Sequence, residues 1–167
     1  MSLRLRYPRM CALIVGLAMV TGLAATSPAR ADGPFSALAG SWSGGGKVDF
    51  NDGKSERLRC RATYTVGGGG SQVSLTLRCA SDSYNFVLTS SLTAQGGSAS
   101  GNWSEQTRGI GGTVSGTVGG NTMRLQVVGP AFGAGLSLAV NGNKQAISIA
   151  SAGSQLKGAS ISLTKGS

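Results

Sequence analysis

The chain has 167 residues, 28 of them glycine, no histidine, and a formal net charge of +9. The lack of histidine excludes Ser-His-Asp and Cys-His nucleophiles and histidine-liganded metal sites. Four of the six acidic residues lie in or beside expected turns, and no basic run is dense enough for nucleic acid. We therefore expect no enzyme, no cofactor, no metal site and no nucleic-acid partner.

Residues 1–31 have the three parts of a secretory signal peptide. Three arginines lie among the first nine residues, an apolar run follows over 10–25, and the small residues Ala29 and Ala31 stand two apart. Cleavage is expected between Ala31 and Asp32. The alternative is a membrane anchor, which needs about 20 apolar residues, and this run is shorter. The sequence thus predicts a periplasmic or secreted protein with no transmembrane segment after cleavage.

The region that would remain, residues 32–167, has a length that suits one domain. Four of the 15 Lys and Arg residues precede it, so 11 remain against six acids and its net charge is +5. A mildly basic surface is compatible with an anionic envelope surface or an acidic protein partner. Ordinary solubility charge is the alternative explanation.

Short runs of alternating apolar and polar residues fill this region, and clusters of glycine, asparagine, aspartate and serine separate them. This pattern is typical of strands joined by tight turns. Ten strands of roughly 6 to 10 residues are predicted. The nine turns between them are expected at 51–54, 67–71, 81–82, 95–97, 107–109, 119–121, 129–130, 141–143 and 152–154. A closed or nearly closed up-and-down barrel completes such an antiparallel all-β meander most simply, because it leaves no unpaired edge; a β-sandwich is the alternative.

One predicted hairpin specifies its own register. Apolar residues occupy the even positions of 58–66 and the odd positions of 73–79. If these strands fold about the glycine-rich turn between them, each apolar residue faces another, and Cys60 faces Cys79. Opposed cysteines in an antiparallel pair come within disulfide distance, above all at a non-hydrogen-bonded position. We predict a Cys60–Cys79 disulfide in an oxidising compartment; a metal site and a reactive thiol are the alternatives.

The first predicted strand opens with Gly40-Ser41-Trp42-Ser43-Gly44-Gly45-Gly46. This motif resembles the Gly-x-Trp start of the calycin barrels, and more closely the Gly-x-Trp-x-Gly-x-Gly start of the nitrobindin-like group. The resemblance implies a small barrel in which Trp42 plugs one end, with a ligand contact of Trp42 as the alternative. Nitrobindin-like haem binding uses a histidine, which this chain lacks. Lipocalins stack an arginine from the end of the barrel on the tryptophan, whereas the last strand here offers only Lys157 and Lys165.

Two groups of charged residues are candidates for a site. Glu105 lies on an expected inner face, so its carboxylate projects into the barrel or its mouth, or else reaches water at the strand end. Arg57, Arg59 and Arg61 alternate on the expected outer face, and the hairpin register sets Arg78 opposite Arg61. Because like charges that face each other are unfavourable, we expect these four arginines to form an anion-facing patch. A solvated outer face that discourages sheet association is the alternative.

The expected inner face of the barrel predicts the function. Ten strands make a wide barrel, and several inner positions hold small residues, namely Gly44, Gly46, Gly101, Gly116 and Ala134. We therefore predict a cavity for a small apolar or amphiphilic ligand. Its expected ligand-binding residues are Tyr64, Leu75, Phe86, Trp103, Glu105, Leu125 and Leu138. Two other functions stay open: a protein-binding module, such as an inhibitor of an extracellular enzyme, and a structural component of the envelope.

Overall fold

The computed structural model describes residues 32–153 and 155–166. The predicted signal peptide lies outside the described residues. Two short 3-10 helices, η1 (Ser36–Leu38) and η2 (Gly68–Gly70), accompany ten strands. The strands are β1 (Gly40–Phe50), β2 (Ser55–Gly67), β3 (Gln72–Ala80), β4 (Asn85–Gln95), β5 (Ser98–Glu105), β6 (Ile110–Gly119), β7 (Thr122–Val128), β8 (Gly133–Asn141), β9 (Lys144–Ala152) and β10 (Leu156–Lys165).

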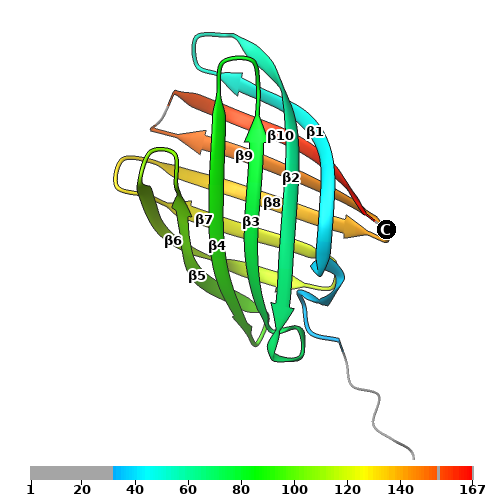
Figure 1. The fold of residues 1–167 in the computed structure, drawn as a ribbon. Coiled ribbons are helices and arrows are strands. Elements are labelled where there is room, and N and C mark those ends of the chain that lie inside the picture. Colours follow the sequence, from blue (N-terminus) through cyan, green and yellow to red (C-terminus); the bar gives the residue numbers. More distant parts are fainter. Residues whose placement is uncertain (1–31, 154, 167) are drawn as a thin grey trace, which may run out of the picture. The chain divides into compact units, whose positions relative to one another are not determined.

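The ten strands close into one antiparallel barrel. Each strand pairs with its neighbours in the chain, and β10 also pairs with β1, so the sheet has no free edge (Figure 1). Strands β2 to β4 form one wall, and β7 to β9 cross behind them at an angle. The predicted all-β meander and up-and-down barrel are confirmed, and the β-sandwich alternative is wrong.

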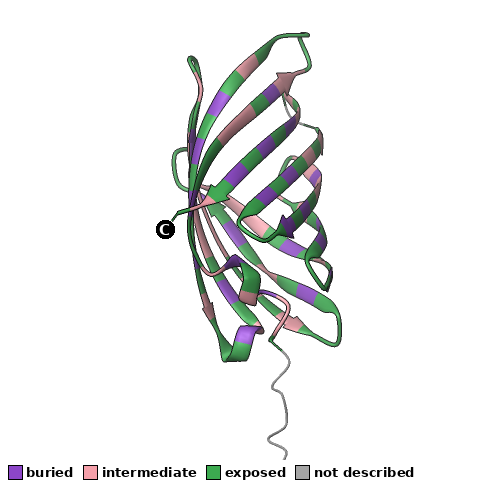
Figure 2. Cartoon of the chain, turned by 90° about the vertical axis from the view of Figure 1, so that its right-hand side faces the viewer, coloured by how far each residue is buried: buried purple, intermediate pink, exposed green. Residues whose placement is uncertain are grey.

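Apolar and polar residues alternate along the sequence of the strands, and buried and exposed residues alternate in the same way in the structure. Along β2 the even residues from Leu58 to Tyr64 are buried, while the odd residues between them are exposed. Figure 2 shows buried and exposed segments alternating along the strands. The register of the β2–β3 hairpin is the predicted one, since Cys60 pairs with Cys79 and Tyr64 with Leu75. A slip by one residue would turn the apolar set of one strand to solvent, which explains why the pattern alone specifies this pairing.

The inner glycines have a different role from the one the sequence suggested. A Cβ atom added to Gly44, Gly46, Gly101 or Gly116 would overlap a carbonyl oxygen of the neighbouring strand. The backbones of adjacent strands therefore approach closely at these positions, as a sheet needs in order to curve and close. Their small size reflects backbone curvature and does not by itself leave a cavity.

The two ends of the barrel differ. One end carries η1 and the β2–β3, β4–β5, β6–β7 and β8–β9 turns, and we call it the plugged end. The remaining turns lie at the opposite end, which we call the mouth. At the plugged end the backbone N–H of Val118 donates to the carbonyl of Gly97, and that of Val140 to the carbonyl of Asn121, each at 2.9 Å. Each of these bonds links one turn of the plugged end to the strand that enters the next turn at that end.

The helix η1 closes the plugged end. Phe35 and Leu38 are buried, and the backbone N–H of Phe35 donates to the carbonyl of Gly70 at 3.0 Å. The indole Nε1 of Trp42 donates to the carbonyl of Leu38 at 2.7 Å. Lys165 Nζ lies 5.6 Å from the centroid of the Trp42 ring, a cation–π distance. Trp42 thus plugs the barrel as the resemblance implied, with a lysine where the lipocalins have an arginine.

Candidate functional site

Apolar side chains near the mouth face the inside of the barrel yet remain partly exposed. Inward residues of the plugged half are mostly buried, among them Tyr64, Val118, Val140 and Leu163. Val66, Leu75, Leu92 and Ala94 are half-buried in the plugged half. Toward the mouth, the half-buried apolar residues are more numerous: Phe50, Phe86, Leu88, Ile110, Val127, Phe132, Leu136, Ile149 and Leu156. The inner face of β4 is half-buried along its whole length. Because the closed sheet shields its inner wall from the sides, solvent reaches these side chains from an end of the barrel.

Three aromatic residues, Phe50, Tyr84 and Phe86, form a rim on one side of the mouth. Tyr84, in the β3–β4 turn, contacts Phe50 and Phe86 with ring centroids 6.5 and 6.1 Å apart. Both pairs meet edge to face, the geometry that aromatic quadrupoles favour. Tyr84 is 36% exposed. This aromatic rim therefore presents an apolar surface with one hydroxyl group to solvent.

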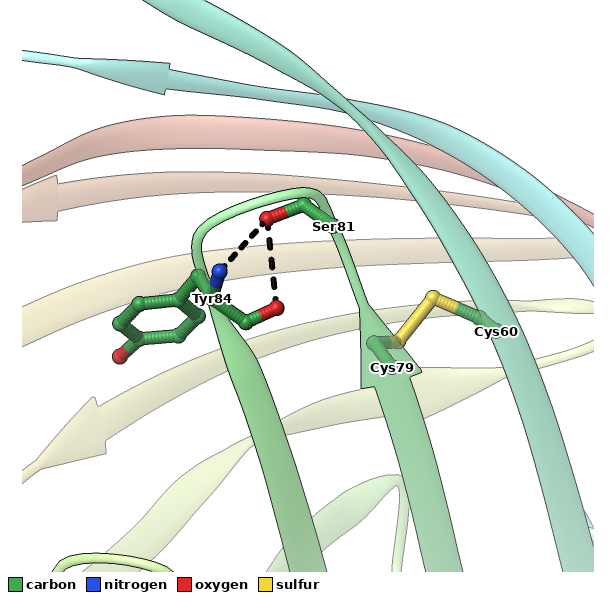
Figure 3. Close-up of a disulfide and its surroundings, with 4 residues drawn as sticks. All are labelled: Cys60, Cys79, Ser81 and Tyr84. Carbon is green, nitrogen blue, oxygen red and sulfur yellow. Dashed lines mark hydrogen bonds between the residues drawn. A yellow bond between two sulfur atoms is a disulfide. The ribbon is translucent and has the colours of Figure 1, made fainter.

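Hydrogen bonds hold the turn that carries Tyr84. The Ser81 hydroxyl accepts from the Tyr84 backbone N–H at 3.1 Å and lies 3.2 Å from the Tyr84 carbonyl (Figure 3). The same hydroxyl lies 2.5 Å from the Glu56 carboxylate on β2, which also accepts from the Ser83 backbone N–H at 3.2 Å. Hydrogen bonds from Ser81 and Ser83 lower the pKa of Glu56 below its usual value. Glu56 thus anchors the rim to the adjacent wall.

Glu105 is buried beneath the β5–β6 turn, only 6% exposed. Its carboxylate accepts from the backbone N–H groups of Thr107 and Arg108 at 2.9 and 2.8 Å, and from that of Val87 at 3.3 Å. Burial opposes ionisation, but these bonds and one from the Thr107 hydroxyl outweigh it, so the pKa of Glu105 lies below its usual value. The carboxylate is therefore engaged by the turn, neither projecting freely into the barrel nor open to water.

Arg108 places a cation beside the aromatic rim. Its guanidinium carbon lies 4.1 Å from the centroid of the Tyr84 ring, and Nη1 lies 3.5 Å from Glu105 Oε2. The arginine side chain is 40% exposed. Since the Glu105 oxygens already accept backbone bonds and the ion pair is long, the guanidinium keeps donors that are free to bind a polar group at the mouth.

The predicted ligand-binding residues all face inward, but they lie at different depths. Phe86 is at the mouth, where Trp103 also contacts Phe132 with ring centroids 5.4 Å apart. Trp103 Nε1 donates to the carbonyl of Val128 at 3.1 Å. Leu75 is half-buried, whereas Leu125 and Leu138 are buried in the core. The structure therefore brings Phe86, Trp103 and Glu105 near the mouth and leaves the others deeper.

Tyr64 belongs to a buried polar pair in the plugged half. Its hydroxyl donates to Gln145 Oε1 at 3.2 Å across the barrel. Gln145 is 2% exposed, and its Nε2 has no hydrogen-bond partner among the described residues. Burial raises the pKa of Tyr64 to about 12, against a smaller opposing effect of the Gln145 bond. The sequence did not predict this pair, because Gln145 is a single polar residue near the start of a predicted strand.

Sequence reasoning did not assign Phe50, Tyr84, Arg108 and Phe132 to the site. Phe50 ends β1 and Tyr84 lies in the β3–β4 turn, so strand alternation alone does not bring them to one site. Their contact depends on how the curved sheet places the ends of β1 and β4, which β2 and β3 separate. Arg108 lies in a turn, where the alternation of a strand carries no information.

The predicted disulfide is present near the mouth. Cys60 and Cys79 are bonded across β2 and β3, with 4.2 Å between their Cα atoms (Figure 3). This separation is typical of a non-hydrogen-bonded antiparallel pair. Both residues are buried, and Cys79 pairs on its other side with Phe86. The disulfide thus joins the two strands that lie between Phe50 on β1 and Phe86 on β4.

The four predicted patch arginines are exposed on the outer wall. Arg61 pairs with Arg78 across the hairpin. Arg59, Arg61 and Arg78 line an open depression of about 480 Å³, whereas Arg57 pairs with Lys47 outside its lining. A second depression, of about 490 Å³, lies over β7 to β10 and is lined largely by serine, threonine and alanine.

Over 32–153 and 155–166, no helix is long and apolar enough to cross a membrane. Within the same part of the chain, no three His, Cys, Asp or Glu side chains gather closely enough to hold a metal ion.

Comparisons with known proteins establish similarity of fold. No protein-family model matches the chain, and no curated protein matches its sequence. Rv2717c from M. tuberculosis has a similar structure, with a TM-score of 0.62 and 17% identity over 79% of this chain and 94% of that chain. The S-type phycobiliprotein lyase CPES from Guillardia theta is similar with a TM-score of 0.57 and 11% identity, over 80% and 90%. These similarities agree with the calycin-like barrel that the first strand implied.

Proposed function

We propose that this protein is an exported carrier that takes up a small apolar or amphiphilic ligand through the mouth of its barrel. One observation carries the proposal: partly exposed inward apolar side chains are more numerous toward the mouth than in the plugged half, where most inward residues are buried. Binding sites for small molecules commonly join apolar walls to a few polar groups. The fold shared with the phycobiliprotein lyase is compatible with a small ligand.

The chemistry of the mouth favours an amphiphile over a purely apolar compound. Phe86 and Leu88 offer apolar surface on the inner wall of β4. Arg108 and the Tyr84 hydroxyl stand at the rim, where a polar end group would remain in contact with water. An amphiphile would place its apolar part inside and its polar end beside the guanidinium.

Binding without catalysis is part of this proposal. It is supported by the absence of histidine from the whole sequence, which removes the commonest general base. The buried carboxylate at the mouth, Glu105, is held by backbone donors and has a lowered pKa, which makes it a poor proton donor near neutral pH.

Export is supported by two features: the signal-like segment 1–31 and the Cys60–Cys79 disulfide, a bond that persists in oxidising compartments. N-terminal sequencing of protein recovered from the envelope or medium of the producing cell tests this. A mature chain that begins at Asp32 supports export. A full-length chain that stays in the cytoplasm contradicts it.

A second candidate function is the docking of another protein at the mouth. Val128, at the end of β7, is 53% exposed, and Tyr84 is 36% exposed at the same end. Large apolar side chains exposed at one end of a domain are candidates for an interaction surface. Protein docking would use outward-facing side chains at the mouth, whereas a carrier would use the inner wall of the barrel. Substitutions on the outer and the inner face therefore distinguish the two functions.

Titration with laurate and dodecanol, followed by calorimetry and tryptophan fluorescence, tests the carrier function. Saturable binding is expected, and Leu88→Ser should weaken it about tenfold by removing apolar contact from the inner wall. Val128→Ser, which changes an outward residue at the same end, should leave it unchanged. The fluorescence change should disappear in Trp103→Phe while calorimetry still detects binding, since Trp42 is sealed in the plugged end.

Two outcomes would contradict the carrier. One is the absence of saturable binding for both compounds in the wild-type protein. The other is an equal loss of affinity in Leu88→Ser and Val128→Ser. That result would indicate adsorption on the outer surface of the mouth and would favour protein docking.

A further inference from the structure

Three arginines lie close together on the outer wall, and none of them forms an ion pair within the described residues. Arg59 and Arg61 lie two residues apart on the exposed face of β2, and Arg78 faces Arg61 from β3. The disulfide marks the adjacent pair as non-hydrogen-bonded, so Arg61 and Arg78 form a hydrogen-bonded pair, whose Cα atoms are about 5.5 Å apart. Like charges on directly paired residues of an antiparallel hairpin are unfavourable unless something compensates them.

Four acidic residues of the described region form ion pairs or hydrogen bonds, and none of these bonds involves the three arginines. Their ion pairs join Lys47 to Asp49, Lys54 to Asp52, and Arg108 to Glu105. The fourth engaged acid, Glu56, bonds to the serines of the β3–β4 turn. The three arginines therefore share no ion pair in the part of the chain that the structure describes.

Small neighbours leave space between these arginines. Arg59 pairs on one side with Gly45 and on the other with Ala80, and Arg61 pairs with Ser43 on the side away from Arg78. A side chain on Gly45 would collide with the backbone of β2. The result is the concave depression of about 480 Å³ lined by the three guanidinium-bearing side chains, with Ser43 and Asn85 as further hydrogen-bonding residues.

We propose that this depression, the arginine groove of Arg59, Arg61 and Arg78, binds a phosphate-type oxyanion with at least two negative charges. Each guanidinium can donate two parallel hydrogen bonds to such a group, and three of them supply more donors than one carboxylate can accept. A concave site lined by three guanidinium-bearing side chains fits a compact anion. A flat anionic surface would instead engage the whole basic face, Arg57 and Lys47 included.

Two sources can supply this chemistry: a soluble phosphate ester and the phosphomonoester headgroup of a lipid. Inorganic pyrophosphate serves as the soluble probe, and phosphatidylcholine vesicles doped with phosphatidic acid serve as the lipid probe. Vesicle attachment that pyrophosphate displaces assigns the lipid source. Pyrophosphate binding without vesicle attachment assigns the soluble source. The site stands in both cases.

The test compares charge-neutralising variants inside and outside the groove by calorimetry. Arg61→Gln and Arg78→Gln should each weaken pyrophosphate binding about tenfold, because each removes charge-assisted hydrogen bonds. Arg57→Gln, on the same strand and face, and Arg124→Gln, on the outer face of β7, remove the same charge outside the groove. These two should change the affinity less than about twofold, because neither side chain lines the groove and an exposed charge without a direct hydrogen bond to the anion contributes little.

Folding of the variants is checked by circular dichroism and thermal melting without ligand. Arg78→Gln should melt no lower than the wild type, because it removes a like-charge contact, so a loss of binding is not a loss of fold. An equal loss of affinity in Arg57→Gln and Arg61→Gln would overturn the proposal in favour of net charge. Failure of the wild type to bind either probe would overturn it as well.

Discussion

The guanidinium of Arg108 lies 4.1 Å from the centroid of the Tyr84 ring, and this contact joins the β5–β6 turn to the β3–β4 turn at the mouth. Tyr84 and Arg108 are far apart in the sequence, and a hydrogen bond from the backbone N–H of each residue holds its turn in place. Glu105 accepts the backbone N–H of Arg108 at 2.8 Å, and Ser81 accepts that of Tyr84 at 3.1 Å. The mouth therefore presents a preorganised cation next to an aromatic surface.

Arg108→Gln should discriminate between ligands that differ only in their polar end. It removes the cation at the rim while leaving the inner wall intact. We expect the affinity for laurate to fall about threefold and that for dodecanol to stay unchanged, since an exposed charge contributes modestly. Calorimetry on both compounds measures the difference. Equal changes for the carboxylate and the alcohol would show that Arg108 does not contact the polar end.

Glu105→Gln should lower the free energy of unfolding by about 2 kcal/mol at neutral pH, because charge-assisted hydrogen bonds to the turn are lost. The pKa of Glu105 in the folded protein lies below its usual 4.5. Stability from this group is therefore fully present above pH 4.5 and is lost as the pH falls through the lowered pKa. Denaturant unfolding from pH 7 downward should show the wild-type and variant curves converging in acid. Curves that stay parallel would contradict this role.

Tyr64 and Gln145 should behave as a coupled pair. Gln145→Leu alone leaves the buried Tyr64 hydroxyl without its partner, and Tyr64→Phe alone leaves the whole Gln145 amide unpaired. Each should cost about 1–3 kcal/mol of unfolding free energy, whereas the double variant should cost less than either single change. A double-mutant cycle by urea unfolding measures the coupling. Simple additivity would mean that the hydrogen bond contributes nothing.

Replacement of both cysteines should destabilise the barrel. Cys60 and Cys79 are 19 residues apart in sequence, and a bridge of this span contributes about 3 kcal/mol through the entropy of the unfolded chain. The Cys60→Ala/Cys79→Ala variant should therefore unfold at lower urea concentration and retain the far-ultraviolet spectrum of a barrel. A thiol count on denatured mature protein provides the control. Two reactive thiols in the exported wild type would refute the bridge.

Gly46→Ala should be far more damaging than Gly119→Ala. A Cβ atom on Gly46 would overlap the carbonyl oxygen of Ser160 on β10, so the strands must separate at a point of closure. We expect a loss of about 3 kcal/mol, as for other overpacked sites. Gly119, at the end of β6, has no heavy atom within 4 Å of the same position, and its substitution should be neutral. Thermal melting of the two variants makes the comparison. Equal melting temperatures would mean that Gly46 has no role in curvature.

The sequence by itself determined the strands, their faces and the β2–β3 register. Alternation has a period of two residues along the chain, and turns are specified by their own glycine and asparagine residues, so both are local properties. Cys60 faces Cys79 because the short turn that joins β2 to β3 sets the register of these two strands. The outward array of Arg57, Arg59 and Arg61 follows from the same period.

Only the tertiary structure decided which distant residues meet. The pairing of Tyr64 with Gln145 and the contact of Lys165 with Trp42 depend on closure of the sheet. The presence of Arg59 and not Arg57 in the lining of the groove depends on the shape of the wall formed by β1 to β4. Closure sets the stagger and curvature of strands that are remote in sequence, and no local period encodes these quantities. The inner glycines illustrate the limit: composition suggested empty volume, whereas their neighbours show that the backbone of the adjacent strand fills the place of the missing side chain.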